Sequence, residues 1–165
     1  MNSLLLLARA DFRWPVWDSA HLSASRLLLS MLILMLPLLA SATTYPVTTT
    51  ADSGPGSLRE AIDLANVNVG PDEITFSTTG TITLTSTLPD ITDTLTITGV
   101  PGFVIDFAGT VFEITNANNV TLESLDLSLG TGDAIVISGN SNDIQVLNNN
   151  LSGHRRAVVA TSTTN

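Results

Sequence analysis

Alternating apolar and polar residues mark a series of short segments from residue 74 onward, and this alternation limits the fold more than any other feature of the chain. A period of two residues is typical of a β-strand with one buried face. The chain is therefore expected to contain many short strands. The apolar pairs that define them are Ile74 and Phe76, Ile82 and Leu84, Leu95 and Ile97, Val120 and Leu122, and Ile144 and Val146.

A second period of about 23 residues lies over this alternation. Offsets that drift by one or two residues fit a solenoid whose turns differ in length. About 23 residues accommodate three short strands and three turns, which predicts the coil of a parallel β-helix. A leucine-rich repeat is not indicated, because its spacing of leucine and asparagine residues is not kept. The aligned segments are 130–138 with 153–161 and 111–115 with 134–138 at an offset of 23, 120–122 with 144–146 at 24, and 94–97 with 119–122 at 25.

Asparagine and glycine occupy the positions between the strands. Asparagine tolerates the left-handed backbone region and bonds to its local backbone, so it suits tight corners. Asparagines stacked at one corner in successive coils can also bond to one another in a ladder. We expect such corners at Asn116, Asn118, Asn119, Gly139, Asn140 and Asn142.

One short helix is predicted ahead of the strands, over residues 57–66. Ser57 and Glu60 form an S-x-x-E capping box, in which each side chain bonds to the backbone N–H of the other residue. A helix this short is marginal alone, so its apolar stripe is expected to cover the open end of the first coil. We predict a cap over residues 43–70 and coils over residues 71–165. The structural residues of the cap are Ser57, Leu58, Glu60, Ile62 and Ala65, with Ala61 completing the stripe.

The first 42 residues have the features of a secretory signal peptide. Arg26 precedes an apolar run over residues 27–40, and Ala40-Ser41-Ala42 provides the small residues at positions −3 and −1 of a cleavage site. The run of fourteen residues is short for a membrane span. We expect bacterial Sec-type export with cleavage after Ala42, the alternative being an uncleaved anchor. The long region before Arg26 also allows a translation start nearer to that residue.

The charge balance excludes several classes of protein. The whole chain has a net charge of −9, and the segment after Ala42 carries three arginines against thirteen carboxylates, or −10. Such a segment lacks the basic surface that binds nucleic acid or an anionic membrane. No cysteine is present, which excludes a disulfide scaffold and a thiolate metal site. We expect no cofactor, and contact with a membrane only through the export signal or an anchor elsewhere.

Carboxylates, two arginines and one histidine are the candidates for chemistry. Glycoside hydrolysis needs two carboxylates across one sugar, for which Asp126 and Asp133, with Glu123 nearby, are the best local candidates. The alternative is that they are solvated carboxylates of strands and turns. Arg155 and Arg156 replace Gly132 and Asp133 of the preceding coil and are expected to be surface variation. His154 is expected to be an exposed turn residue, and Asp52, Asp72, Asp90 and Asp93 are the acidic turn residues considered for calcium.

At this point a resemblance adds to the prediction. The stretch D-S-G-P-G-S-L-R-E-A-I-x-x-A-N, followed by D-E-I-T-F and T-I-T-L-T-S-T-L-P, resembles the start of exported bacterial right-handed parallel β-helix proteins with a CSLREA-type cap. These include polymorphic outer-membrane and autotransporter-like surface proteins. The resemblance covers roughly residues 46–99 and departs from the signature at Gly56, where cysteine is common. It implies an all-β, right-handed β-helix with a helical N-terminal cap.

These observations predict an exported, non-catalytic β-helix protein that acts as a passenger, adhesin or spacer. Its ladder faces would offer threonine and asparagine side chains to carbohydrate or to a host or matrix protein. The alternative is the amino-terminal part of a polysaccharide lyase or glycoside hydrolase whose active site lies in coils outside this sequence. The final residues 163–165 match residues 140–142, so the chain is expected to be a fragment that ends in a turn or a short protein completed by assembly.

Overall fold

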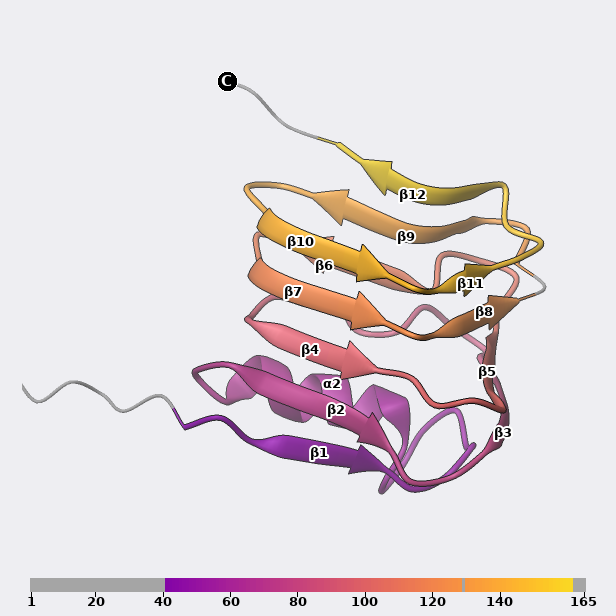
Figure 1. Cartoon of the computed structure of the whole chain (residues 1–165), viewed down its shortest axis with the longest axis horizontal. Coiled ribbons are helices and arrows are strands. Elements are labelled where there is room, and N and C mark those ends of the chain that lie inside the picture. Colours follow the sequence, from indigo (N-terminus) through magenta and orange to yellow (C-terminus); the bar gives the residue numbers. More distant parts are fainter. Residues whose placement is uncertain (1–40, 129, 162–165) are drawn as a thin grey trace, which may run out of the picture. The chain divides into compact units, whose positions relative to one another are not determined.

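The computed structural model describes residues 41–128 and 130–161 and shows a parallel β-helix with one short helix (Figure 1). The chain runs along the front sheet, turns, returns along the back and rises by one coil, which is a right-handed path. The predicted fold class is confirmed. The elements are β1 (Thr44–Val47), α2 (Leu58–Val67), β2 (Asp72–Phe76), β3 (Gly80–Thr83), β4 (Leu95–Thr98), β5 (Phe103–Asp106), β6 (Phe112–Thr115), β7 (Asn118–Glu123), β8 (Asp126–Ser128), β9 (Asp133–Ser138), β10 (Asn142–Leu147), β11 (Asn150–Leu151) and β12 (Arg156–Ala160).

Three parallel sheets form the walls of the solenoid. The first has the order β1-β2-β4-β7-β10, the second β11-β8-β5-β3, and the third β12-β9-β6. The coils that begin with β4, β7 and β10 each contribute one strand to each wall, and every neighbour within a sheet comes from the coil before or after. In the second coil an isolated bridge from Ile91 to Ile114 takes the place of a strand in the third wall.

The register of the strands reproduces the offsets that the sequence repeats predict. Phe112 pairs with Ile135 at an offset of 23, and Ile135 pairs with Val158 at the same offset. The offset is 25 between Ile97 and Leu122. The coils therefore contain about 23 residues and differ in length by one or two, as predicted.

Apolar side chains fill the interior in columns that follow this register. Ile82 stacks on Ile105 and then on Leu127 in the second wall, and all three are fully buried. The alternation of apolar and polar residues places each apolar side chain inward because successive side chains of a strand point to opposite faces. The other large fully buried side chains are Leu58, Ile62, Ile74, Ile91, Leu95, Ile97, Phe112, Ile114 and Leu122.

The corners repeat from coil to coil in backbone conformation. Asn119 and Asp143, which are 24 residues apart, both have φ of 55°. At the next corner Ser124 has φ of 56° and Asn148 has φ of 55°. Residues with short polar side chains reach this left-handed region at lower cost than bulky residues do. Of the predicted corner residues, Asn116 (φ of 54°) and Gly139 (φ of 65°) have this conformation between strands, and Asn119 has it within β7. Asn118 and Asn142 instead lie in β7 and β10.

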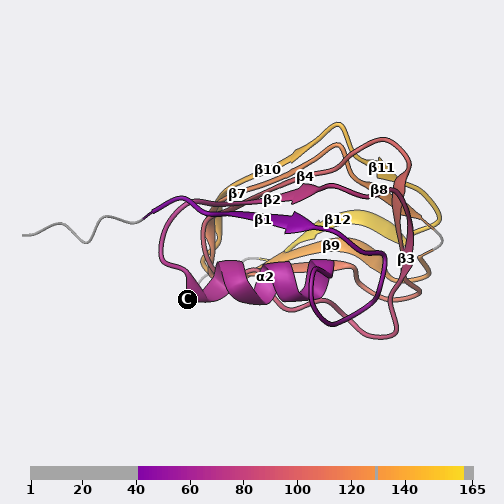
Figure 2. The ribbon, with the colours of Figure 1, turned by 90° about the horizontal axis from the view of Figure 1, so that it is seen from below.

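Helix α2 lies at the lower end of the solenoid, beside β1 and β2. Figure 2 looks along the solenoid from below and shows the helix from its side. Its stripe of Leu58, Ala61, Ile62 and Ala65 is buried. The helix begins one residue later than predicted and ends at Val67. In the first coil the helix takes the place of a strand of the third wall, because that wall begins only at the Ile91 bridge of the second coil.

The capping box forms in part. The Ser57 hydroxyl accepts a hydrogen bond from the Glu60 N–H at 3.2 Å, as predicted. The Glu60 carboxylate accepts from the Gly56 N–H at 2.6 Å and not from the Ser57 N–H, which donates to the Gly54 carbonyl at 3.1 Å. The prediction for Glu60 was wrong because the tight turn before the helix supplies a local carbonyl for the Ser57 N–H.

Gly56 lies in the tight turn that precedes α2. Its φ is 77°, and a Cβ there would lie 2.2 Å from the Thr48 Oγ1. The Gly56 carbonyl also accepts from the Thr48 N–H at 2.9 Å, which holds β1 against the start of α2. Glycine is the residue that fits this close approach at positive φ.

Candidate binding surface

The outward side chains of the first wall form two rows, which are polar except for Leu147. Glu73, Thr96, Thr121 and Gln145 are in register in one row, and Thr75, Thr98, Glu123 and Leu147 in the other. We call these eight residues the ladder face. Neighbouring strands lie about 4.8 Å apart, so hydroxyl, amide and carboxylate groups repeat at that spacing. The face is the sheet that crosses the front of Figure 1.

The threonines of the ladder face are held firmly. Thr75, Thr96, Thr98 and Thr121 are half-buried by their neighbours in the adjacent coils. Threonine is restricted about χ1, so its hydroxyl loses little freedom when it binds a partner. The ladder face is therefore a preformed surface of hydrogen-bonding groups.

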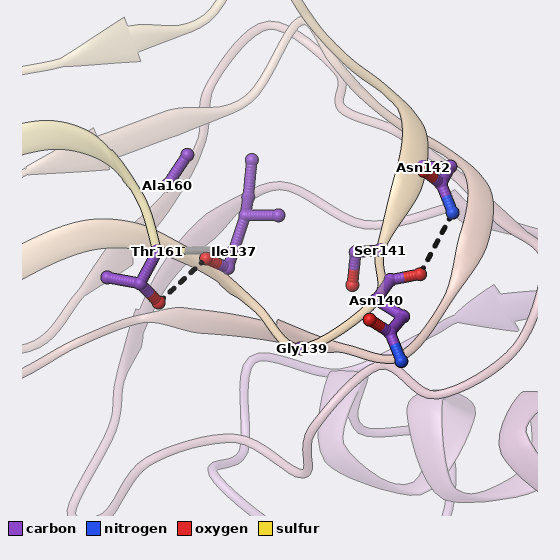
Figure 3. A pocket seen from close by; sticks show the side chains of 7 residues that line it. All are labelled: Ile137, Gly139, Asn140, Ser141, Asn142, Ala160 and Thr161. Atoms are coloured by element: carbon purple, nitrogen blue, oxygen red, sulfur yellow. Dashed lines mark hydrogen bonds between the residues drawn. The ribbon is translucent and has the colours of Figure 1, made fainter. Parts of the chain in front are cut away.

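An asparagine corner borders this sheet. The Asn142 side-chain amide donates to Asn118 Oδ1 at 3.1 Å, which is the predicted ladder between successive coils. The Asn116 Oδ1 accepts from the Asn140 N–H at 3.0 Å. Beside this corner lies a shallow hollow of about 230 Å³ (Figure 3). Its lining consists of Ile137, Gly139, Asn140, Ser141, Asn142, Ala160 and Thr161.

The arginine pair binds one carboxylate. Arg156 lies opposite Asp133 in the sheet register and its Nη2 is 2.6 Å from Asp133 Oδ2. The Arg155 Nη2 is 3.1 Å from the same oxygen. The two arginines were expected to be surface variation. They are largely exposed, as expected of surface residues, and they also form an ion-paired cluster with Asp133 of the preceding coil.

The cluster shifts the pKa values of Asp133 and Arg156. Side-chain hydrogen bonds from Arg156 and then Arg155 hold the pKa of Asp133 well below its ordinary value. The same carboxylate raises the pKa of Arg156. In the cap, hydrogen bonds from Thr85 and Arg59 lower the pKa of Asp52. Asp133 and Asp52 are therefore held ionised by their partners, which suits structural ion pairs and does not suit a proton donor.

The three carboxylates considered for glycoside hydrolysis do not meet. Glu123 lies on β7 of the first wall, Asp126 on β8 of the second and Asp133 on β9 of the third. Asp126 Oδ1 accepts from the Asn150 amide at 3.1 Å, and Asp133 is occupied by the arginines. Because the three project from different walls, they do not form a pair across one sugar.

His154 differs from its predicted exposed position. Its ring lies against Gly130, where a Cβ would be 1.9 Å from Nδ1. Both ring nitrogens are buried and have no hydrogen-bond partner within residues 41–128 and 130–161. The turn therefore packs the imidazole inward, because glycine leaves room in the coil below.

The acidic turn residues considered for calcium are used locally. Asp52 pairs with Arg59 at 2.8 Å, and Asp93 Oδ1 accepts from the Thr94 N–H at 2.7 Å. Asp90 Oδ2 lies 3.4 Å from the Thr115 hydroxyl, and Asp72 is buried. In the part of the chain that the structure describes, no three His, Asp or Glu side chains come together as a metal site.

Two cap contacts were missed by sequence reasoning. Arg59 donates to the carbonyl of Ser86 at 3.0 Å, and Asn66 donates to the carbonyl of Asp90 at 2.7 Å and accepts from the Thr92 N–H at 2.9 Å. These bonds join both ends of α2 to the backbone of residues 86–92. The cap thus satisfies backbone groups of the second coil as well as covering the end of the core. A polar residue at each end of a short amphipathic helix was the available signal.

Residues 1–40 of the predicted signal peptide, including Ala40, lie outside the described residues, and Ala42 is exposed. Within residues 41–128 and 130–161 no helix has the length and apolar character needed to cross a membrane. No protein-family model matches the chain, and no curated protein is similar enough to be counted as a relative.

Proposed function

We propose that this chain is an exported, non-catalytic β-helix protein of the secreted or cell-surface type, whose ladder face binds carbohydrate. The single observation that carries the proposal is the ladder face itself. Its threonine hydroxyls stack in register from coil to coil, together with the Gln145 amide and the carboxylates of Glu73 and Glu123. The sheet holds these groups in place before any partner arrives. A preorganised surface loses less entropy on binding than a flexible one does.

The charge of the segment favours a neutral polysaccharide as the partner. Threonine hydroxyls and the Gln145 amide both donate and accept, as sugar hydroxyls do. A net charge of −10 after Ala42 repels acidic polymers at a distance. A host or matrix protein is the other partner class, and it is tested by the same experiment.

The sequence supports the export part of the proposal. The apolar run over residues 27–40 and the Ala40-Ser41-Ala42 site are typical of a cleaved signal. The resemblance of residues 46–99 to CSLREA-type capped surface proteins favours the same location. We therefore propose a place among such passenger or adhesin proteins, with the solenoid acting as a spacer that carries the ladder face.

The test is to express the full chain in a Gram-negative host, collect the exported protein, and measure binding to neutral polysaccharides, acidic polysaccharides and matrix proteins. The ladder-face variant carries Thr96→Arg and Thr121→Arg. A matched control carries Thr81→Arg and Thr83→Arg, which are exposed outward residues of β3 in the second wall.

The proposal predicts binding to a neutral polysaccharide that falls at least about tenfold in the ladder-face variant and is kept in the control, since only the first pair lies on the ladder face. If the protein binds a matrix protein and no polysaccharide, the carbohydrate partner is rejected and a protein partner takes its place in the proposal. Retention of the chain in the cytoplasm, or equal binding by both variants, would overturn the proposal.

A further inference from the structure

A carboxylate occupies an inward position of the first wall. In β2 the inward side chains alternate as Asp72, Ile74 and Phe76, and Asp72 lies directly below Leu95 in the register. Asp72 is 3% exposed. An ionised carboxylate in such a place is costly unless it is paired and fully hydrogen-bonded.

The pairing is only half complete. Asp72 Oδ1 accepts from the Thr43 N–H at 2.9 Å and from the Asn68 amide at 2.7 Å. Asp72 Oδ2 is buried and has no hydrogen-bond partner among the described residues. The three arginines in that part of the chain are bound elsewhere, to Asp52 and Asp133.

The donor to Asp72 is the backbone nitrogen that follows the predicted cleavage site. Asn68 also bonds the Thr43 hydroxyl at 3.1 Å and the Ser41 carbonyl at 3.2 Å, so the segment around this site is fixed against the cap. Ala42 is exposed, whereas Thr43 is half-buried.

We propose that export processing after Ala42 creates a new α-ammonium group on Thr43 and that this group forms a buried ion pair with Asp72. This inference rests on the proposed export signal. An export peptidase adds water across the Ala42–Thr43 peptide bond: the carboxylate leaves with Ala42, and the freed amine of Thr43 takes up a proton. The single N–H that now faces Asp72 becomes three donors with a positive charge, enough to serve both carboxylate oxygens.

The absence of lysine makes the α-amine directly measurable. The processed chain has one primary amine, so an amine-reactive N-hydroxysuccinimide ester labels only Thr43. We would identify the N-terminus of the exported protein by mass spectrometry and measure its native labelling rate. The same rate would be measured on Asp72→Asn and on Asp63→Asn, a matched change of an exposed carboxylate on α2.

A second preparation separates this inference from the export proposal. In this preparation a lysine-free protease site replaces residues 1–42. Cutting then leaves Thr43 as the first residue whether or not the natural chain is exported. A companion chain is cut one residue earlier and begins at Ala42, which keeps Asp72 intact but displaces the amine. This companion serves even if Asp72→Asn fails to fold.

The expected result is labelling of the Thr43 amine that is at least about tenfold slower than in the Ala42-first chain or in Asp72→Asn, with Asp63→Asn unchanged. Equal labelling rates in the two cut chains would overturn the ion pair. An exported protein whose first residue is not Thr43 would overturn the processing step. The ion pair between the Thr43 amine and Asp72 is then tested by the labelling rates of the two cut chains. If the chain cut before Thr43 is labelled slowly but the natural chain is not exported, the proposed function is rejected and the ion pair with Asp72 is kept.

Discussion

Truncation of Leu58 to alanine should destabilise the protein far more than the same change at Leu64, although both residues lie on α2. Leu58 is 1% exposed and belongs to the core, whereas Leu64 is 43% exposed. Alanine is the best helix former, so neither change weakens the helix through propensity. The difference between the two variants therefore measures how strongly the helix packs on the coils.

The magnitude follows from burial. Removing a fully buried leucine side chain costs its transfer free energy plus a cavity term, about 2–5 kcal/mol in all. At Leu64 about half of the side chain is already in water, so we expect about 1 kcal/mol or less.

Urea unfolding followed by circular dichroism gives both free energies of unfolding, and light scattering on Leu58→Asp tests the cap directly. We expect Leu58→Asp to self-associate because it uncovers the end of the core and the backbone of residues 86–92. Equal costs for Leu58→Ala and Leu64→Ala, or a soluble monomeric Leu58→Asp, would refute the role of α2 as a cap.

Three further predictions concern single residues. Ser57→Ala should lower the free energy of unfolding by about 1 kcal/mol, measured by urea titration, because the Glu60 N–H loses its acceptor. Gly56→Ala should cost more than about 1 kcal/mol by the same titration, owing to its φ of 77° and the contact with Thr48; equal stability would contradict the turn. Asp133 has a lowered pKa in the folded protein, so its contribution is present above the unfolded pKa of about 4 and is lost as the pH falls. Asp133→Asn should therefore flatten the decline of thermal stability below about pH 4, and an unchanged decline would reject the ion pair.

Much of the fold could be predicted from local sequence. The alternation of apolar and polar residues around Ile97 and Leu122 predicted which side chains point inward. The offsets between the sequence repeats predicted the strand register. Both features follow from the periodicity of the sequence itself. The start of α2 was predicted to within one residue, since Ser57 is a local capping signal.

What sequence reasoning missed depends on contacts between distant residues. The polar residues Arg59 and Asn66 at the ends of α2 indicate that they could make hydrogen bonds, but the sequence around them does not show that their partners are the backbone groups of residues 86–92. Asp126 and Asp133 were considered as a possible carboxylate pair, but they lie in different walls because seven residues are enough to move the chain from one wall to the next. Asp72 was considered as a calcium ligand of a turn, whereas the strand parity places it inward beside Thr43.

Disulfide trapping tests the coil register, on which the core, the ladder face and the position of Asp72 all depend. The chain has no cysteine, so a pair introduced at Thr96 and Thr121 reports on those positions alone. They are direct neighbours in the register and about 4.8 Å apart, which suits a disulfide. Thr98 and Thr121 are offset by two residues and lie about 8 Å apart, beyond disulfide reach.

The measurement is oxidation of the two double-cysteine variants in the native protein, followed by mass spectrometry of the cross-linked peptides. The account predicts rapid and complete closure for Thr96→Cys with Thr121→Cys, and none for Thr98→Cys with Thr121→Cys. Closure of the second pair in preference to the first would contradict the 25-residue coil between β4 and β7, and with it the ladder face.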